Sequence, residues 1–345
     1  MSVPAREGTR DAYGRALARL GADPRVVVLD ADLFRSTRTH LFAERFPERF
    51  FEMGIAEQDM VSTAAGLAAA GKIAFANSFA VFITGRAFDQ VRQQIALPAA
   101  NVRLCGSSAG LTEGADGATH QSVLDVALMR SLPNMAVVVP CDGPETEHAV
   151  EASLAWDGPI YLRLSRYETP AWTGTPLLPR ASAPAGGYAG NTLPRVKKPA
   201  GGAAIPDFAI GKARILRSGT DVTLAATGVI MGEVLAAADF LAARGISAEV
   251  LDIHTVKPLD TDSILASASK TGRVLTIEEH SIYGGLGSAV CEAIAEGAKS
   301  HIPVRRLGVR DVFGESGEAD QLLELHGLTS PHIARAAEEL ARRRC

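Results

Sequence analysis

The sequence is short of several features that mark particular classes of protein. Its 345 residues include only four cysteines, which are scattered and form no CxxC pair. They are therefore interpreted as free thiols in a reducing compartment and not as a disulfide framework. A basic excess is also missing, because 35 Lys and Arg residues against 39 Asp and Glu residues leave a net charge of −4. That balance argues against nucleic acid or an anionic membrane as a partner.

Long apolar runs are absent as well. The chain contains no run of about 18 consecutive apolar residues, which excludes a transmembrane helix. The N-terminal stretch MSVPAREGTRDAYG is polar and lacks the apolar core of a signal peptide. From these two observations we expect a cytoplasmic protein.

The residues that are present predict an α/β fold. A hydrophobic content of 47% with 21% charged residues is typical of large buried cores, and the length predicts two domains. Short β-branched runs such as 25–29 alternate with helical patterns such as 57–70, which predicts doubly wound, mostly parallel sheets. Between residues 168 and 206 lie seven of the 18 prolines and six glycines, a composition typical of a linker. The expected parts are residues 1–167, a linker or surface excursion at 168–211, and residues 212–345.

Two groups of residues in the first part are candidates for a buried site. Glu57 follows the turn at Gly54 and opens a predicted apolar helix, where the helix dipole favours an acid. An ordinary helix start explains it equally well. Phe79 and Phe82 follow a predicted strand and could form an aromatic platform, although core packing is the simpler interpretation of two aromatic residues.

Two further groups are polar. Asp116 and His120 share the glycine-rich stretch GADGATH, where a carboxylate could tune an imidazole that transfers protons near neutral pH. Arg163 and Arg166 leave a predicted strand at the sheet edge where parallel sheets bind ligands, and an arginine there can hold a phosphate or carboxylate. An ordinary turn and a surface salt bridge are the alternative interpretations.

Taken in order, these motifs resemble a known family. The stretches MGIAEQDM, FANSFAVFITGRAFDQVR, SSAGLTEGADGATHQ and LRLSR resemble the pyrimidine-binding half of the transketolase family. The stretches VTLAATG, VLDIHTVKPLD and EEHSIYGGLGSAV resemble its C-terminal domain. The resemblance therefore assigns residues 1–167 to a pyrimidine-binding domain and residues 212–345 to a transketolase C-terminal domain.

The resemblance implies an enzyme that uses thiamine diphosphate to transfer a two-carbon ketol unit from a ketose donor to an aldehyde acceptor. Glu57 matches the catalytic glutamate that hydrogen-bonds the pyrimidine N1′, and burial is expected to favour its neutral form. Phe79 and Phe82 match the aromatic pair against which the aminopyrimidine packs. Arg86 is assigned to the cofactor with them.

On the substrate side, the resemblance assigns Asp116, His120 and Arg166 to substrate contacts and gives His120 a catalytic role as well. Sugar-phosphate transketolases commonly carry a histidine twelve positions before the one matched by His120, where this chain has Ser108. A serine lacks the charge of an imidazolium, so we expect a substrate other than an ordinary pentose or tetrose phosphate. Arg163 or a residue from a partner could replace the missing histidine.

Part of the family's cofactor site is absent from the sequence. The family holds the diphosphate and Mg²⁺ through a Gly-Asp-Gly motif followed about 30 residues later by Asn, and the chain has no Gly-Asp-Gly. The resemblance therefore implies the second subunit of a split transketolase, with no metal ligands of its own. Its partner would be an N-terminal subunit that carries the motif, in an α2β2 assembly.

Other interpretations stay open at this point. Deoxyxylulose-phosphate synthase shares the GADGxTHQ run, and the second subunit of 2-oxoacid dehydrogenases has a similar length. A paralogue that only binds a partner is a third possibility, against which the candidate site residues argue. A Rossmann oxidoreductase rests only on Gly285–Val290, where the third position of the fingerprint is valine.

Overall fold

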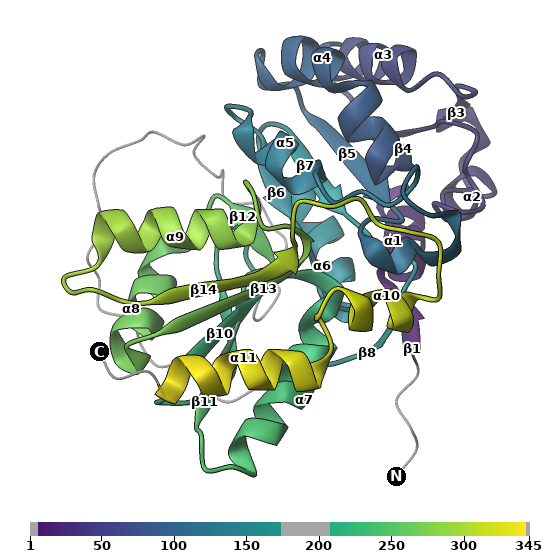
Figure 1. The fold of residues 1–345 in the computed structure, drawn as a ribbon. Helices are drawn as coiled ribbons and strands as arrows, with labels where there is room; N and C mark the ends of the chain where they lie inside the picture. The colour runs from purple at the N-terminus through teal and green to yellow at the C-terminus, as the bar shows by residue number, and fades with distance from the viewer. Residues whose placement is uncertain (1–5, 174–207, 343–345) are drawn as a thin grey trace.

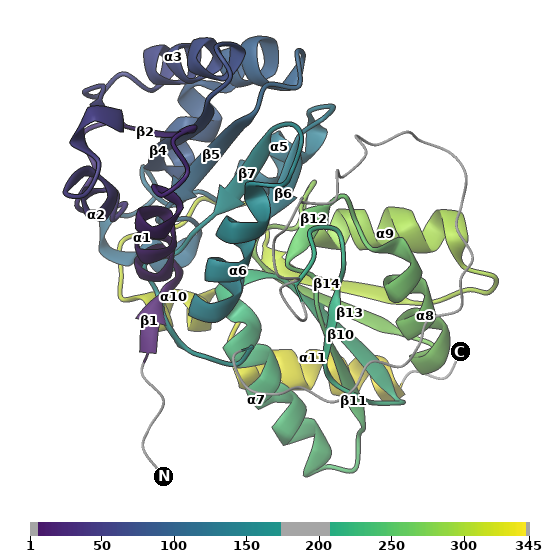
Figure 2. The same cartoon turned by 180° about the vertical axis from the view of Figure 1, so that it is seen from behind.

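The computed structural model describes residues 6–173 and 208–342, and these form two large sheets and one small one. Figures 1 and 2 show the two large sheets side by side, the first built from the N-terminal half of the chain. The first sheet has seven strands in the order β12-β6-β7-β5-β4-β2-β3, all parallel except β12 at the edge. Its strands are β2 (Val26–Asp30), β3 (Phe50–Glu52), β4 (Ile73–Phe79), β5 (Val102–Ser107), β6 (Ala136–Val138), β7 (Ile160–Arg163) and β12 (Thr255–Lys257).

Continuous apolar runs give this sheet two buried faces. Val26 and Val28 pack in one core and Val27 and Leu29 in the other, because successive side chains of a strand point to opposite faces. The helices are α1 (Thr9–Leu20), α2 (His40–Ala43) and α6 (Gly143–Ser153) on one face, and α3 (Glu57–Ala69), α4 (Phe88–Gln90) and α5 (Asp125–Ser131) on the other. The π-helical turns η2 (Phe82–Arg86) and η3 (Val91–Ala96) flank α4, and the 3₁₀ turns are η1 (Pro47–Arg49) and η4 (Leu111–Asp116).

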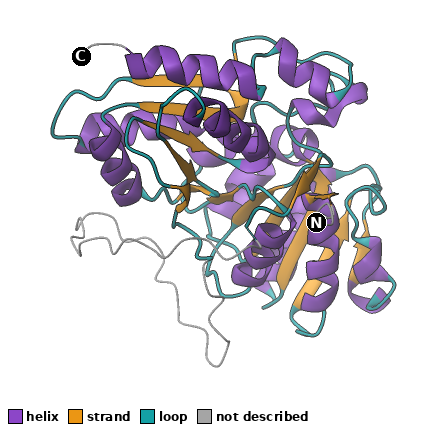
Figure 3. Ribbon diagram, turned by 90° about the horizontal axis from the view of Figure 1, so that it is seen from below, coloured by secondary structure: helices purple, strands orange, loops and turns teal. Residues whose placement is uncertain are grey.

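The second sheet is built in the same way. It has five strands in the order β14-β13-β10-β11-β9, of which only β9 runs antiparallel. Its strands are β9 (Arg214–Arg217), β10 (Val222–Ala226), β11 (Ala248–Asp252), β13 (Val274–Ser281) and β14 (Val304–Val309). Helices α7 (Met231–Ala242), α10 (Ala319–Leu325) and α11 (Ser330–Arg342) cover one face, α8 (Thr261–Thr271) and α9 (Leu286–Gly297) the other, and η5 (Gly228–Ile230) precedes α7. Figure 3 shows helices on both sides of the strands.

This architecture confirms the predicted α/β class with mostly parallel sheets. Within the part that the structure describes, no helix combines the length and the apolar character that crossing a membrane requires. The sequence pattern did not predict the short elements α2, β3 and β9, nor helices α8 and α10.

The boundary between the parts differs from a simple linker. The proposed segment 168–211 begins with strand β8 (Glu168–Pro170), which pairs antiparallel with β1 (Arg6–Gly8). Residues 174–207 of that segment lie outside the described residues. Strand β12 comes from the second half of the chain but pairs with β6 of the first sheet. The two halves therefore share a sheet, and the domain limits expected from composition stay a prediction.

A buried arginine holds the end of helix α6. Arg103 on β5 is 1% exposed, and its guanidinium donates hydrogen bonds to the carbonyl oxygens of Ser153, Trp156 and Gly158 at 2.5–3.1 Å. Burial lowers the pKa of Arg103 to about 9. The side chain therefore replaces water for carbonyl groups that the last turn of a helix leaves unpaired.

Replacing Arg103 with methionine should destabilise the fold, because three buried carbonyl groups would lose their donor. We expect the free energy of unfolding to fall by at least about 2 kcal/mol in urea denaturation. Arg103→Lys keeps the charge but has fewer hydrogen-bond donors. Its free energy of unfolding should therefore lie between those of the wild type and Arg103→Met. The exposed Arg92→Met is the control and should change stability by less than about 0.5 kcal/mol. An unchanged midpoint for Arg103→Met would contradict this role.

Candidate active site

The candidate residues gather at one edge of the first sheet. Strands β4, β5 and β7 end at Phe79, Ser107 and Arg163, and the carboxyl ends of parallel strands lie at the same edge. Helix α3 begins at Glu57 beside β4. The loop that follows β5 returns to the sheet at α5 and carries the glycine-rich motif. The topology thus brings together residues that are far apart in the sequence.

Glu57 lies in a pocket made by its own chain. Its side chain is 1% exposed, and Ser78 Oγ donates a hydrogen bond to Glu57 Oε1 at 3.3 Å. Arg86 Nη1 lies 2.7 Å from Glu57 Oε2 and forms an ion pair with it. The resemblance assigns both residues to the cofactor, and in the structure they bind each other. The expectation that Glu57 acts as a neutral acid on the cofactor stays a prediction.

An aromatic platform adjoins this ion pair. The rings of Phe79 and Phe82 stack with centroids 6.1 Å apart and an interplanar angle of 15°. The Arg86 guanidinium lies 4.6 Å from the centre of the Phe82 ring. The imidazole of His120 meets Phe82 edge-on at 5.3 Å and Phe79 at 6.1 Å. The glycine-rich loop therefore reaches the aromatic pair through His120.

A π-helical turn sets the position of Arg86. The backbone N–H of Ala87 donates to the carbonyl of Phe82, five residues earlier, at 3.4 Å. Such a turn holds one more residue than an α-helical turn, and π-turns occur often at functional sites. It leaves Arg86 on the same side as Phe82, where its side chain reaches back to Glu57.

A second cluster of charged residues lies beyond His120. Arg166 Nη1 is 3.1 Å from Glu113 Oε1 and 3.6 Å from Asp116 Oδ2. The pKa of Glu113 is raised to about 7, first by burial and then by the hydrogen bond with Asp116, although Ser108 and Arg166 act to lower it. The hydrogen bond with Glu113 lowers the pKa of Asp116. Ser108 adopts a left-handed backbone conformation, with φ of 53°, that turns the chain after β5.

Glu113 and Arg10 are site residues that the sequence did not reveal. The first turn of α1 is tied to the end of β7, because the N–H of Arg10 donates to the carbonyl of Ser165 at 3.2 Å. Burial lowers the pKa of Arg10, and the nearby guanidinium groups of Arg38 and Arg166 lower it as well. The buried Nε of Arg10 has no hydrogen-bond partner among the described residues. Cationic donors thus converge here beside Glu113.

Arg163 does not join this cluster. It is 7% exposed, lies 2.7 Å from Asp125 Oδ2, and donates to the carbonyl groups of Ser122 and Glu279 at 3.1 and 3.0 Å. All of these hydrogen bonds are to buried groups of the protein itself, and none of them is made to Glu113 or Asp116. The sequence-based suggestion that Arg163 replaces the missing histidine therefore does not fit its position.

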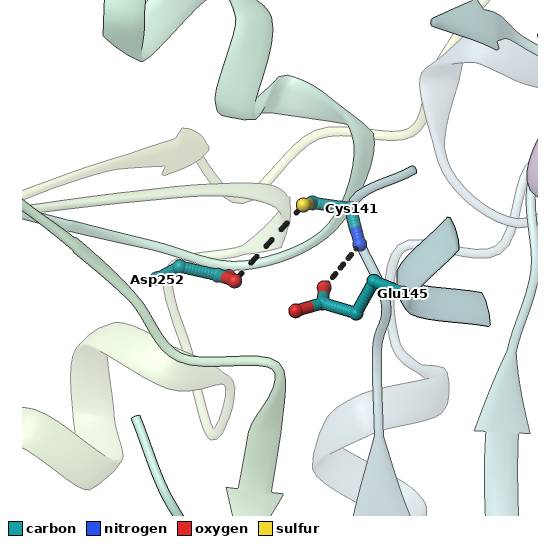
Figure 4. Close-up of side chains that lie close together, drawn as sticks. All are labelled: Cys141, Glu145 and Asp252. Atoms are coloured by element: carbon teal, nitrogen blue, oxygen red, sulfur yellow. Dashed lines mark hydrogen bonds between the residues drawn. The ribbon is translucent and has the colours of Figure 1, made fainter. Parts of the chain in front are cut away.

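Another cluster lies at the seam between the two sheets (Figure 4). Cys141 N–H donates to Glu145 Oε2 at 2.9 Å, and Cys141 Sγ lies 4.0 Å from Asp252 Oδ2. Burial raises the pKa of Asp252 well above its ordinary value, and the neighbouring Glu145 carboxylate raises it further. Arg214 Nη1 lies 3.6 Å from Glu145 Oε1 and balances the remaining charge. This cluster is internally compensated, and the sequence-based expectation of no metal ligands stays a prediction.

With this geometry in place, comparison with known proteins identifies the family. Residues 7–171 match the transketolase pyrimidine-binding domain, and residues 211–333 match the transketolase C-terminal domain. The chain belongs to the transketolase family. The resemblance that the ordered motifs indicated is therefore confirmed, and so is the fold class.

The most similar transketolase relatives include separate subunits. The chain is 42% identical to the 6-deoxy-6-sulfo-D-fructose transketolase subunit SqwH of Clostridium sp. (strain MSTE9), over 97% of this chain and 95% of that protein. It is 41% identical to a putative transketolase C-terminal section of Methanocaldococcus jannaschii, over 96% of both. A solved split-gene transketolase, described as an inactive β4 tetramer, superimposes with a TM-score of 0.80 at 42% identity, covering 97% of this chain and 98% of that one.

A buried acid beside the turn η4 should make stability depend on pH. Glu279 on β13 is 2% exposed and accepts a hydrogen bond from the N–H of Thr112. Burial raises the pKa of Glu279 to about 7 from the ordinary 4.5. The folded chain therefore binds this proton more tightly than the unfolded chain. The resulting stabilisation is complete below about pH 4.5 and is lost as the pH rises through 7.

Glu279→Gln removes this titration while keeping an oxygen that can accept the Thr112 bond. Between pH 5 and pH 8, we expect the free energy of unfolding of the variant to increase relative to the wild type by about 2–3 kcal/mol. Urea denaturation of both proteins at the two pH values measures the difference. A difference that does not change with pH would show that Glu279 ionises normally in the folded chain.

Proposed function

We propose that this chain is the second subunit of a two-component transketolase, in which it supplies the pyrimidine side of a thiamine diphosphate site. The observation that carries the proposal is the buried carboxyl group of Glu57 beside the Phe79–Phe82 stack. Family membership and the similarity to separate transketolase subunits support it.

The residues fit one half of the cofactor. An aminopyrimidine is a flat aromatic ring with ring nitrogens, and Phe82 offers it a ring face while Glu57 offers a carboxyl group at its edge. For the diphosphate and Mg²⁺ the sequence lacks the Gly-Asp-Gly motif. We therefore assign Glu57, Phe79, Phe82 and Arg86 to the pyrimidine, and the diphosphate and Mg²⁺ to a partner subunit with that motif.

In this proposal Glu57 exchanges its partner when the cofactor binds. The bound thiamine diphosphate supplies the carbon nucleophile that takes up the two-carbon unit. Glu57 holds a proton at the pyrimidine N1′, and Arg86 gives up its position over Phe82 to the ring. His120, held against Phe82, moves protons to and from substrate oxygens. Asp116 accepts hydrogen bonds from substrate hydroxyl groups.

Assembly completes the site. The solved relative with a TM-score of 0.80 is described as an inactive tetramer of β chains, which supports the inference that one subunit alone is not sufficient. We propose an α2β2 heterotetramer in which each cofactor lies between subunits. Obligate interfaces of this kind commonly bury about 2,000 Å² or more.

Glu57→Gln tests the proposed site directly. With the partner subunit, Mg²⁺ and thiamine diphosphate, the wild type should exchange the proton at C2 of the thiazolium ring with deuterium rapidly, as measured by NMR. The variant should exchange several orders of magnitude more slowly, because an amide can hydrogen-bond N1′ but cannot share a proton with it. The isolated chain should neither exchange this proton nor bind the cofactor at micromolar concentrations in calorimetry.

Arg92→Met, on the neighbouring turn η3, is the matched control and should exchange like the wild type. Light scattering should show that Glu57→Gln assembles normally. Near-normal exchange by the variant would remove Glu57 from the mechanism, and micromolar cofactor binding by the isolated chain would contradict the divided site.

The charged cluster indicates a substrate with a terminal monoanion. The half-exposed guanidinium of Arg166 can hold an anionic group, and the nearby guanidinium of Arg10 adds positive charge. The carboxyl group of Glu113 lies on the same side and, when it is ionised above its pKa of about 7, repels a second negative charge. A sulfonate is a monoanion at neutral pH, whereas a phosphate carries about −1.5 to −2. The name of the relative SqwH, which specifies a 6-deoxy-6-sulfo sugar, is consistent with this proposal.

We therefore expect the reconstituted enzyme to favour 6-deoxy-6-sulfofructose over fructose 6-phosphate in kcat/KM, with the same aldehyde acceptor. Glu113→Gln should narrow that preference about tenfold, because it removes the repulsion of the dianion (about 1.4 kcal/mol). A kcat/KM of about 10⁴ M⁻¹s⁻¹ or more with xylulose 5-phosphate and ribose 5-phosphate would refute the preference.

A further inference from the structure

The loop that carries Asp116 and His120 has little support from its own backbone. This substrate loop, residues 110–121, contains Gly110, Gly114 and Gly117 at φ values of 87°, 82° and 75°, which favour glycine. Its internal bonds include those from the N–H groups of His120 and Gln121 to the carbonyl of Gly117, both 3.0 Å. A glycine-rich loop of this kind keeps one conformation only if neighbouring elements hold it.

The second half of the chain provides that support. A bracing segment, residues 311–318, links β14 to α10 and crosses to the first sheet (Figure 1). Gln121 Nε2 donates to the carbonyl of Glu315 in this segment at 2.9 Å. The same amide donates to the carbonyl of Gly114 at 3.0 Å and lies 3.4 Å from that of Leu111. One buried amide thus joins Leu111 and Gly114 of η4 to the bracing segment.

Close packing surrounds this amide. A methyl group at Gly117 would approach Ser316 Oγ to 2.5 Å, and one at Gly114 would approach the carbonyl of Gly317 to 3.2 Å. Helix α10 packs against η4, and Tyr167 donates to Asp320 Oδ1 of that helix at 2.6 Å. Contact between loop and segment therefore extends well beyond a single hydrogen bond.

We propose that Gln121 is a positioning residue through which the C-terminal domain sets the conformation of the substrate loop. The amide fixes η4 against the bracing segment, and this fixes where Asp116 and His120 meet the substrate. The pyrimidine side of the site is carried by separate elements, α3, β4 and η2. Loss of the contact between Gln121 and the bracing segment should impair substrate use while leaving cofactor activation intact. This consequence for catalysis rests on the proposed function.

Gly314→Ala disturbs the contact between Gln121 and the bracing segment by a change in the second half of the chain. A methyl group there would lie 1.8 Å from Gln121 Oε1, so the amide must move away. Gln121→Glu tests it from the loop, because a carboxyl group of the same shape loses both amide donors. The exposed Glu318→Ala, in the same segment, is the matched control.

Hydrogen–deuterium exchange of the full chain supplies a readout that needs no activity. Both test variants should exchange the amides of residues 110–121 at least tenfold faster than the wild type, and Glu318→Ala should not. In the reconstituted enzyme, both should lower kcat/KM for the ketose at least tenfold while C2 proton exchange stays within twofold. If Gln121→Glu does not fold, Gly314→Ala decides alone.

Unchanged loop exchange in Gly314→Ala would overturn the proposal. A loss of C2 proton exchange parallel to the loss of turnover would also overturn it, because that result indicates general disruption. Absence of transketolase activity in the wild type would refute the proposed function. The hydrogen–deuterium exchange of residues 110–121 would still test whether the bracing segment holds the loop.

Discussion

The buried ion pair between Arg163 and Asp125 is the constraint on which the site depends. Both side chains are nearly inaccessible, and Arg163 also bonds the carbonyl groups of Ser122, just after the substrate loop, and Glu279 of the second sheet. Tyr161 donates to the same Asp125 oxygen at 2.6 Å. The pair thus ties β7, α5, the loop and β13 at one point. Loss of either partner would leave an uncompensated buried charge, which is far costlier than loss of an exposed pair.

The candidate site groups of the first half are paired with one another. Glu57 binds Arg86, and Glu113 binds Arg166, while the outer partner of each pair is about half exposed. The pairs keep buried carboxyl groups compensated in the chain alone. A ligand that binds here must take the place of one partner of an ion pair. The site therefore selects ligands by charge, because the ligand must compensate the charge of the partner that remains. This explains how one chain can present a preformed site without a ligand.

The sequence predicts what depends on local pattern and misses what depends on distant packing. Short apolar runs locate β2, β4 and β5, and the apolar run after Glu57 locates α3. Arg10 belongs to the polar side of a predicted helix, and only the contact of α1 with Ser165, 155 positions later, places it beside Arg166. Likewise, β12 is too short to stand out by composition, and its place in the first sheet follows from pairing with β6. Arg163 and Arg166 are indistinguishable in LRLSR, although one is buried and the other faces the site.

A divided cofactor site couples assembly to binding. When one ligand bridges two subunits, each subunit contributes part of its binding free energy. By linkage, the factor by which assembly strengthens ligand binding equals the factor by which the ligand strengthens assembly. The first half supplies a carboxyl group and an aromatic platform, whose gain from stacking is only about 0.5–1.5 kcal/mol beyond area. Under the proposed function, the partner subunit adds the contacts to the diphosphate and Mg²⁺. The division then makes the assembled state the one in which Arg86 is displaced from Glu57, and it links the start of the chemistry to the presence of the partner.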